Sequence, residues 1–229
     1  MTPATSRAAR KFTEEYVPPD AVLIHAMSWA VELGVGSVSP ASGAVLRLLA
    51  AATRARSVVE IGTGTGVSGI WLLRGMRPDG VLTSIDDEPD LQGMARQSFA
   101  AAGFPTGRAR LIPGPAREVL PRLADGTYDL VFVDGDVSEY GLCVDAAQRL
   151  LRDGGVVVVN NAFAGATQGV PASTESAEVT DVVARLRDAP EWQPALIGAG
   201  EGLLCAAKRP TAPDEPRDHG ANVIPLRRS

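Results

Sequence analysis

One stretch in the first third of the chain constrains the fold more than any other feature of the sequence. It reads Val58-Val59-Glu60-Ile61-Gly62-Thr63-Gly64-Thr65-Gly66-Val67-Ser68-Gly69, and passes from a segment suited to a buried strand, through glycines, into an apolar helix. Glycines at these positions permit positive φ angles and leave no Cβ between the backbone and a ligand. The helix that follows points the positive end of its dipole at the same place. We interpret this stretch as a site for a nucleotide-containing cofactor.

Two acidic residues narrow the class of cofactor. Glu60 stands directly before the glycines, where a carboxylate attracts an ammonium or sulfonium group and does nothing for a pyrophosphate. Asp86 ends the next apolar stretch, about 20 residues after the turn, where an acid typically binds ribose hydroxyls. Both features favour S-adenosylmethionine. The spacing Gly64-x-Gly66-x-x-Gly69 also satisfies the dinucleotide pattern, so an NAD-dependent oxidoreductase is the alternative at this point.

Length, charge and cysteine content limit the remaining possibilities. The chain has 229 residues, which suits one full-sized core better than two domains. Its net charge of −5 offers no basic field for nucleic acid, so we expect a small-molecule partner. The cysteines, Cys143 and Cys205, lie in apolar segments and are expected to be reduced, as in a cytoplasmic protein. No apolar run suggests a signal peptide or a membrane span, so we expect neither export nor a membrane partner.

Apolar strands and helices alternate along most of the chain. Continuous apolar segments such as 130–133 and 156–159 are typical of a parallel sheet covered on both faces, and the alternation predicts a doubly wound, Rossmann-like α/β fold. The glycine-rich connection 198–202 is short enough only for antiparallel neighbours, so a mostly parallel, seven-stranded sheet should end in an antiparallel hairpin. The predicted strands are 57–61, 81–86, 108–113, 128–134, 155–160, 194–197 and 203–208. The predicted helices between and after them are 67–76, 89–102, 116–124, 138–151 and 175–188.

Two N-terminal helices should precede the first strand. Pro18-Pro19-Asp20 offers a helix start, and apolar residues recur at helical spacing as far as Leu33. A second helix is predicted over 42–53. We expect a loose arm over 1–17, with a short helix at 11–16, and a disordered tail over 210–229. Between them, residues 18–209 should form a single domain, made of a helical cap (18–56) and an α/β core (57–209). Within the core, a loop is expected over 162–174.

Polar residues and glycines follow the first five predicted strands. Ligands of doubly wound sheets bind at the carboxyl ends of the strands, so these residues should meet at one site. They are Gly62, Asp86, Gly114, Asp134 and Asn160.

Taken together, these motifs give the chain, over about residues 20–208, a resemblance to a known family. It resembles the class I methyltransferases, and within them the cation-dependent O-methyltransferases similar to catechol and caffeoyl-coenzyme A O-methyltransferases. The segments that carry the resemblance are 38–43, 59–68, 84–86, 128–136, 150–155 and 200–204. It implies an enzyme that moves a methyl group from S-adenosylmethionine to a hydroxyl of a small aromatic acceptor, and it implies a homodimer.

The resemblance also implies roles for individual residues. Glu60 and Asp134 would lie near the methionine ammonium, and Ser68 near its carboxylate. Asp86 would bind the ribose diol, and the Ala116 N–H would meet the adenine because Pro115 has no N–H. The predicted cofactor-binding residues are Val38 at the cofactor's edge, Glu60, Gly62, Thr63, Gly64, Gly66, Ser68, Asp86, Ala116 and Asp134.

The implied cation site departs from the family pattern. Family members place an Asp, at the position of Asp134, and an Asp-Asn pair, at the end of the fifth strand, around Mg²⁺ or Mn²⁺. This chain has Asn160-Asn161 there, which keeps oxygen donors but removes a charge on which hard cations depend. The expected ligands are Asp134, Asn160 and Asn161, with Asp136 as a substitute, and the binding of a divalent cation is left open.

The implied catalytic base departs as well. The family's lysine, three residues after the metal-binding Asp, is replaced by Val137, which cannot accept a proton. The expected catalytic residues are Asp134 and Asp136, with a metal-bound hydroxide, solvent or His25 as other sources of the base. Asn160 and Val137 also leave open a second interpretation, in which the protein binds cofactor but has lost catalysis.

Overall fold

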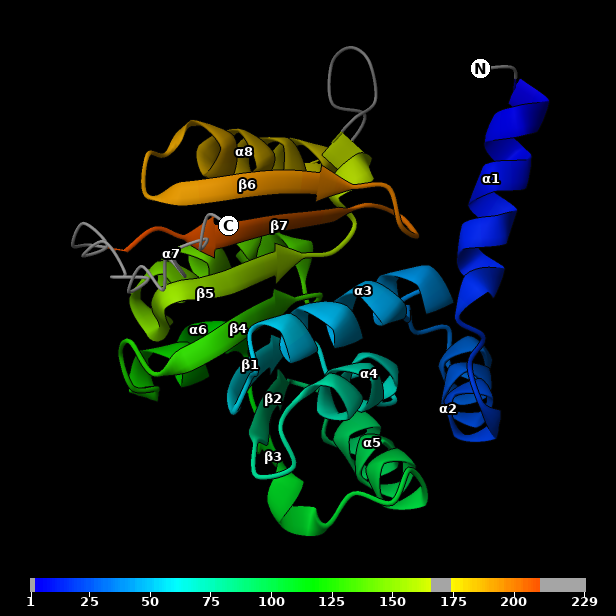
Figure 1. Ribbon diagram of the computed structural model, residues 1–229. Coiled ribbons are helices and arrows are strands. Elements are labelled where there is room, and N and C mark those ends of the chain that lie inside the picture. Colours follow the sequence, from blue (N-terminus) through cyan, green and yellow to red (C-terminus); the bar gives the residue numbers. More distant parts are fainter. Residues whose placement is uncertain (1–2, 166–173, 211–229) are drawn as a thin grey trace, which may run out of the picture.

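Short segments rich in β-branched and other apolar residues form a central sheet in this computed structural model, which describes residues 3–165 and 174–210. The strands are β1 Ser57–Ile61, β2 Val81–Asp86, β3 Ala109–Pro113, β4 Tyr128–Val133, β5 Leu151–Val159, β6 Trp192–Ile197 and β7 Leu203–Lys208. They form one seven-stranded sheet in the order β3-β2-β1-β4-β5-β7-β6 (Figure 1). The first five strands pair in parallel, and β7 is antiparallel to both β5 and β6. The predicted mostly parallel sheet with a C-terminal antiparallel hairpin is therefore confirmed.

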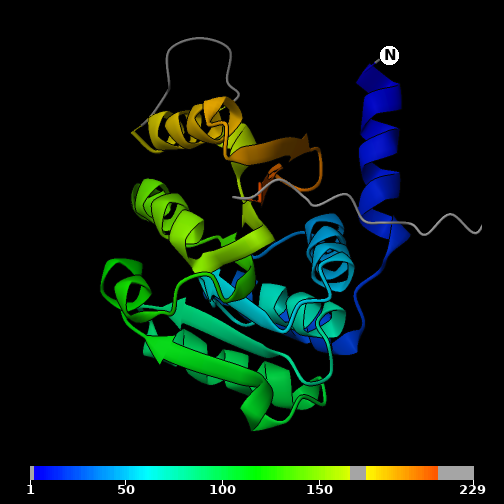
Figure 2. The ribbon, with the colours of Figure 1, turned by 60° about the vertical axis from the view of Figure 1, so that its left-hand side comes forward.

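Helices cover both faces of this sheet (Figures 1 and 2). The helices of the described ranges are α1 Pro3–Tyr16, α2 Ala21–Glu32, α3 Pro40–Ala52, α4 Val67–Gly75, α5 Pro89–Ala101, α6 Ala116–Val119, α7 Tyr140–Leu150 and α8 Thr174–Asp188, of which α2 to α8 pack on the sheet. Successive strand residues point to opposite faces, so Val58 packs in one apolar cluster with residues of α2 to α5. Its neighbour Val59 packs in a second cluster with residues of α6, α7 and α8. The doubly wound architecture is thus confirmed, with two apolar layers separated by the sheet.

The strand order reverses between β1 and β4. From β1 the chain builds outward through β2 to β3, whereas β4 lies on the other side of β1 and leads to β5. Helices from the two directions diverge at this switch point and leave a crevice at the carboxyl ends of the strands. The backbone of the two central strands stays close past their ends, because the Asp134 N–H donates to the Ile61 carbonyl at 2.8 Å.

The first helix is the main difference from the prediction. The short helix expected at residues 11–16 is present, but it extends back to Pro3, so the expected loose arm is wrong for residues 3–10. Residues 3–16 form the continuous helix α1 at the edge of the molecule (Figure 1). Its charged side chains contact segments far away in the sequence, and these contacts supply the stability that the local sequence pattern does not indicate.

Smaller differences concern the ends of elements. The predicted helix over 116–124 divides into α6 and a 3₁₀ turn, Leu120–Arg122, because Pro121 lacks an N–H and cannot continue the α-helical ladder. The strand predicted to begin at residue 155 begins at Leu151, and the one predicted at residue 194 begins at Trp192. Ala162–Gly165 form a 3₁₀ turn, while most of the predicted 162–174 loop and residues 211–229 of the predicted tail lie outside the described residues. None of the helices in the described ranges is both long and apolar enough to cross a membrane.

Candidate active site

A cavity of about 580 Å³ opens at the switch point between β1 and β4. Its volume lies within the range of about 300–1,000 Å³ that is usual for small-molecule sites. The residues at all five predicted strand ends line this cavity, namely Gly62, Asp86, Gly114, Asp134 and Asn160. The structure therefore brings together the strand ends that the sequence placed at one site.

The glycine turn after β1 lies close against the end of β4. Gly62 has φ +92°, and a Cβ built on it would lie 2.5 Å from the Asp134 carbonyl oxygen. Gly66, with φ +90°, is the N-cap of α4 and provides no side-chain hydrogen bond to the first turn of that helix. The first N–H groups of α4 are thus free of a side-chain cap and can bind an anionic group such as a carboxylate. Ser68, predicted beside that carboxylate, lies in this first turn and lines the cavity.

Asp86 organises the same turn. Its Oδ2 accepts hydrogen bonds from the backbone N–H groups of Thr63 at 2.8 Å and Gly64 at 2.9 Å. Its Oδ1 accepts from the Glu88 N–H at 3.0 Å. A carboxylate has about four lone-pair positions, so Asp86 can hold the turn and still accept a hydroxyl hydrogen from the cavity. Sequence reasoning predicted the second role but not the first.

Glu60 is fully buried beneath the turn and does not line the cavity. The Ser84 hydroxyl donates to its Oε2 at 2.6 Å, while Oε1 has no hydrogen-bond partner among the described residues. Burial, together with the neighbouring carboxylates of Asp134 and Asp86, raises the pKa of Glu60 from 4.5 to about 7, and hydrogen bonds from the Ser84 and Ser68 hydroxyls oppose part of this rise. An unpaired, buried carboxylate oxygen favours a cationic group in the adjoining space.

Asp134 meets both asparagines of the predicted ligand set. The Asn160 Nδ2 donates to Asp134 Oδ1 at 2.8 Å, and the Asn161 Nδ2 approaches the same oxygen at 3.5 Å. Burial raises the pKa of Asp134 to about 7, although the Asn160 hydrogen bond lowers it. Asn161 adopts a left-handed backbone conformation with φ +57°, which asparagine tolerates better than most residues.

This donor set does not fit a hard divalent cation. Of the three expected ligands only Asp134 carries a charge, and the two amides turn N–H groups, which cannot bind a cation, toward it. Across the described ranges, no cluster of three or more His, Cys, Asp or Glu side chains could hold a metal ion. The expected ligands are brought together, but as a hydrogen-bonded cluster.

Other predicted residues lie in varied positions. Val38 is buried in the core and is not among the residues that line the cavity, whereas the loop before it, 35–37, does line it. The Ala116 N–H, assigned to the adenine, donates to Glu139 Oε2 at 3.2 Å, and Glu139 also pairs with Arg117 at 2.9 Å.

The candidate bases lie in different places, and only some of them line the cavity. Asp136 lines the cavity and accepts a hydrogen bond from the Ser138 N–H at 2.8 Å. His25 is exposed on α2, packs against the ring of Trp29 at a centroid distance of 4.3 Å, and does not line the cavity. Val137 packs against the apolar cluster that includes α7.

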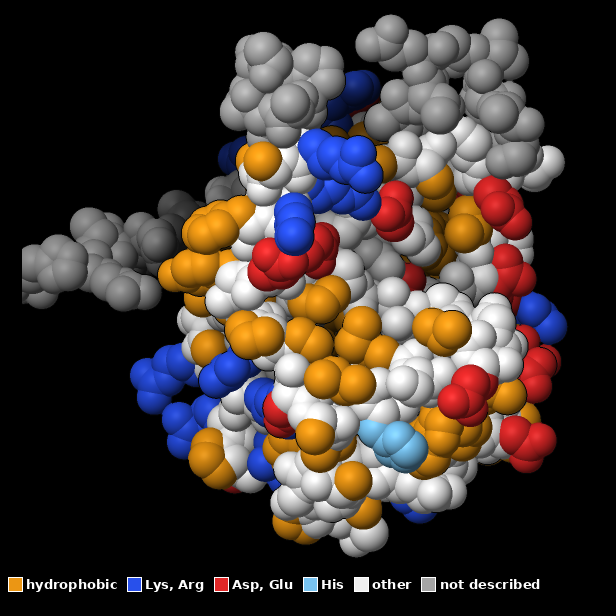
Figure 3. Space-filling view, turned by 90° about the vertical axis from the view of Figure 1, so that its right-hand side faces the viewer, with side chains coloured by type: hydrophobic (Ala, Val, Ile, Leu, Met, Phe, Trp, Pro, Cys, Tyr) orange, Lys and Arg blue, Asp and Glu red, His pale blue; other side chains and the backbone are white. Residues whose placement is uncertain are grey.

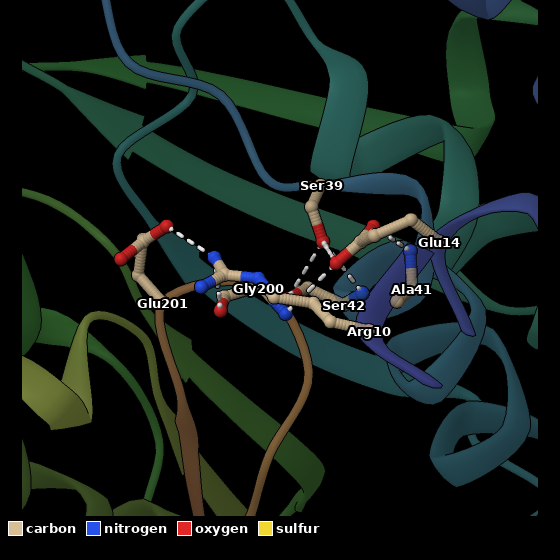
Figure 4. Close-up of polar contacts among 7 residues, drawn as sticks. All are labelled: Arg10, Glu14, Ser39, Ala41, Ser42, Gly200 and Glu201. Carbon is tan, nitrogen blue, oxygen red and sulfur yellow. Dashed lines mark hydrogen bonds and ion pairs between the residues drawn. The ribbon is translucent and has the colours of Figure 1, made fainter. Parts of the chain in front are cut away.

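Glu201 had no predicted role, yet this residue lines the cavity and contacts α1 (Figure 4). Arg10 donates to Glu201 Oε1 at 2.9 Å and to the Gly200 carbonyl at 3.2 Å. Glu14 accepts from the Ser39 hydroxyl and from the N–H groups of Ala41 and Gly200 at 3.0–3.2 Å. The carboxylate of Glu14 thereby also caps the start of α3, where negative charge is favoured. These contacts form a tether from α1 to α3 and to the turn between β6 and β7.

Comparison with known proteins gives a consistent result. Residues 25–209 match the model of a family described as O-methyltransferase. A protein of Mycobacterium sp. strain JLS, with a provisional O-methyltransferase assignment, is 48% identical over 209 residues, covering 90% of this chain and 94% of its own length.

Two solved structures that are 27% and 28% identical to this chain share its fold. A protein from Corynebacterium glutamicum is 27% identical with a TM-score of 0.83, over 91% of this chain and 99% of its own. The O-methyltransferase TomG from Streptomyces achromogenes, involved in tomaymycin synthesis and solved with S-adenosylmethionine, is 28% identical with a TM-score of 0.80, over 92% of this chain and 100% of its own. These matches favour methyl transfer over the dinucleotide interpretation of the glycine turn. The chain belongs to the O-methyltransferase family.

Proposed function

We propose that this protein transfers the methyl group of S-adenosylmethionine to a hydroxyl of a small aromatic acceptor, with residues 18–209 as one catalytic domain. The observation that carries the proposal is the uncapped start of α4 beside the buried Glu60 and the cavity-lining Asp86. These groups match, in turn, the carboxylate, the ammonium and the ribose of the cofactor.

Each predicted site residue has a proposed role in this arrangement. The N–H groups at the start of α4 and the Ser68 hydroxyl bind the methionine carboxylate. Glu60 and Asp134 attract its ammonium, and the turn at Gly62, Thr63, Gly64 and Gly66 provides the bare backbone against which the cofactor lies. Asp86 binds the ribose diol. Ala116 receives the adenine once the Glu139 side chain has released its N–H, and Val38 supports the loop 35–37 from behind.

In the reaction, the acceptor oxygen attacks the methyl carbon in line with the sulfonium. The C–S bond breaks as the O–C bond forms, and the products are S-adenosylhomocysteine and a methyl ether. The hydroxyl proton passes to the carboxylate of Asp136, which lines the cavity, and from there to solvent. Alignment of the two reactants supplies much of the reduction in the barrier.

The charge of the cavity wall supports an acceptor without negative charge. Seven carboxylates and one guanidinium, that of Arg117, line the cavity. Arg117 is paired with Glu139, so little positive charge is available for an anionic acceptor. Neutral or cationic phenols are therefore better candidates than phosphorylated ones.

Calorimetric titration with S-adenosylhomocysteine tests the cofactor site. Wild-type protein should bind, and Asp86→Asn should bind about 10 to 100 times more weakly, because a charged acceptor for the ribose is lost. Asp87→Asn is the matched control, since Asp87 lines the same cavity without holding the turn. Transfer of labelled methyl groups to a panel of phenols then identifies the acceptor. Failure of the wild-type protein to bind S-adenosylhomocysteine would refute the function.

We also propose a homodimer in the cytoplasm, formed through α1 and α2. Large apolar side chains are exposed on these helices, and Figure 3 shows hydrophobic side chains gathered on this side of the molecule. They are Phe12, Tyr16, Ile24 and Val31. Surfaces of this kind commonly mark an interface between subunits. Sedimentation of the wild type and of a Val31→Glu variant tests the proposal, and a monomeric wild type would contradict it.

A further inference from the structure

The carboxyl ends of β4 and β5 place Asp134 and Asn160 side by side. Val133 and Val159 are paired in the parallel ladder, so the next residue on each strand stands at the same edge of the sheet. The Asn160 N–H donates to the Val133 carbonyl at 2.9 Å, which fixes the backbone on both sides of the pair. The geometry is therefore determined by the sheet and not by a loop.

The orientation of the amides follows from the charge on Asp134. The Asn160 Nδ2 lies 2.8 Å from Asp134 Oδ1, and Asn160 is only 6% exposed. Turning this amide by half a turn would bring its carbonyl oxygen against a carboxylate oxygen, and two acceptors would then face each other. The N–H group is the one that satisfies both partners in a buried position.

A neutral residue at position 160 changes what the site requires. Two carboxylates at this distance would repel each other and would need a cation between them. Asp134 already repels the buried Glu60, so a further acid would place three carboxylates together. Asn160 removes that repulsion and supplies a hydrogen-bond donor in its place.

We propose that the Asn160 amide takes the place of a divalent cation beside Asp134, so that this methyltransferase binds its cofactor and acts without a metal ion. Asn160 is a positioning residue: its N–H holds the Asp134 carboxylate at the wall of the cavity, and the Asn161 N–H supports the same oxygen from a longer distance. The inference rests on the proposed function, since it concerns the same cavity.

Titration with Mn²⁺, followed by calorimetry and by the paramagnetism of the ion, gives a direct test that needs no acceptor. Wild-type protein, free and saturated with S-adenosylhomocysteine, should show no saturable Mn²⁺ binding. Its affinity for S-adenosylhomocysteine should change by less than about twofold between chelator and excess Mg²⁺. Stoichiometric Mn²⁺ binding to the wild type, or a tenfold or larger effect of the chelator, would overturn the proposal.

Variants at position 160 separate the two parts of the proposal. Asn160→Asp should gain saturable Mn²⁺ binding, and its melting temperature should rise when Mn²⁺ is added, whereas that of the wild type should not. If this variant binds no Mn²⁺, then Asn160 alone does not replace the cation, and the proposal is wrong. If it does not fold, the wild-type titration decides the question by itself.

Loss of the amide should weaken the cofactor site. Asn160→Ala should bind S-adenosylhomocysteine about tenfold more weakly, because Asp134 loses its close N–H donor. Asn161→Gly is the matched control: glycine tolerates the left-handed backbone there, and the amide that it removes lies farther from Asp134, so its effect should be smaller. An equal loss in the two variants would contradict the role of Asn160.

Failure of the function and failure of the inference are distinguishable. If the wild type binds no S-adenosylhomocysteine in any buffer, the function is refuted, and the Mn²⁺ titration of the free protein still tests the cation. The wild type could also bind S-adenosylhomocysteine without metal but methylate no phenol. That result would support the second interpretation, a cofactor-binding protein without catalysis. It would refute the part of the proposal that concerns action without a metal.

Discussion

Replacing the buried Glu60 by glutamine should make the stability of the protein less sensitive to pH. Burial raises the pKa of Glu60 from 4.5 to about 7 in the folded protein. The folded state therefore binds this proton more tightly than the unfolded chain does. The stability that Glu60 contributes is present below about pH 4.5 and is lost as the pH rises through about 7.

The magnitude follows from the difference between the two pKa values. At about 1.4 kcal/mol for each pH unit, ionising Glu60 in the folded protein costs about 3 kcal/mol of unfolding free energy above pH 7. Asp134, whose pKa is also raised to about 7, adds a loss in the same direction. Glu60→Gln removes the first contribution and keeps the second. Relative to the wild type, the variant should gain up to about 3 kcal/mol between about pH 5 and pH 8.

Urea unfolding of both proteins across this pH range measures the effect, and calorimetry measures its functional counterpart. Glu60→Gln should bind S-adenosylhomocysteine about 10 to 100 times more weakly, because the ammonium loses a charged partner. The control is Glu88→Gln, an exposed residue that lines the same cavity. A difference in unfolding free energy between wild type and Glu60→Gln that does not vary with pH would refute the reasoning.

Two further substitutions test the backbone of the site and the position of α1. Gly62→Ala should lower the unfolding free energy by about 2–5 kcal/mol, since it combines an unfavourable φ with a collision at the Asp134 carbonyl. Gly64→Ala, where φ is +50° but an added Cβ would make only ordinary contacts at 3.9 Å, should cost about 1–2 kcal/mol, and equal losses in urea unfolding would contradict this account. Glu14→Ala should increase hydrogen exchange in α1 by releasing three hydrogen bonds, while the control Glu15→Ala, which removes only an exposed ion pair to Lys11, should leave exchange unchanged. Equal exchange in the two variants would show that Glu14 does not hold the helix.

The sheet and the cavity could be predicted because their signals are local in the sequence. Valine-rich strands buried on both faces read as continuous apolar runs, and the glycines of the turn are needed for the backbone itself. The five strand ends then meet for topological reasons that do not depend on side-chain detail. For this reason Asp86 and Asp134 could be placed at the site without knowing any distance.

What the sequence did not indicate depends on partners distant in the chain. Nothing near α1 shows that Glu14 meets Gly200, so the segment resembles a loose arm. Glu139 takes the Ala116 N–H, and Asp86 holds the glycine turn, through hydrogen bonds between segments more than 20 residues apart. The direction of the Asn160 amide likewise depends on the neighbouring strand. Side-chain orientation of this kind is determined by tertiary contacts and leaves no local pattern.

The tether between α1 and the β6–β7 turn also sets an order for the assembly of the protein during translation. Glu14 and Gly200 are 186 residues apart, so α1 has to wait for a partner that is synthesised much later than the helix itself. At roughly 5–20 residues per second, that interval is roughly 10 to 40 seconds on the ribosome. During this time α1 would carry its exposed Phe12 and Tyr16 without the contacts that hold it in place. The β6–β7 turn, which brings Glu201 to the cavity wall, would then take its place late in folding, and a nascent chain would have the complete cavity only after this hairpin has left the ribosome.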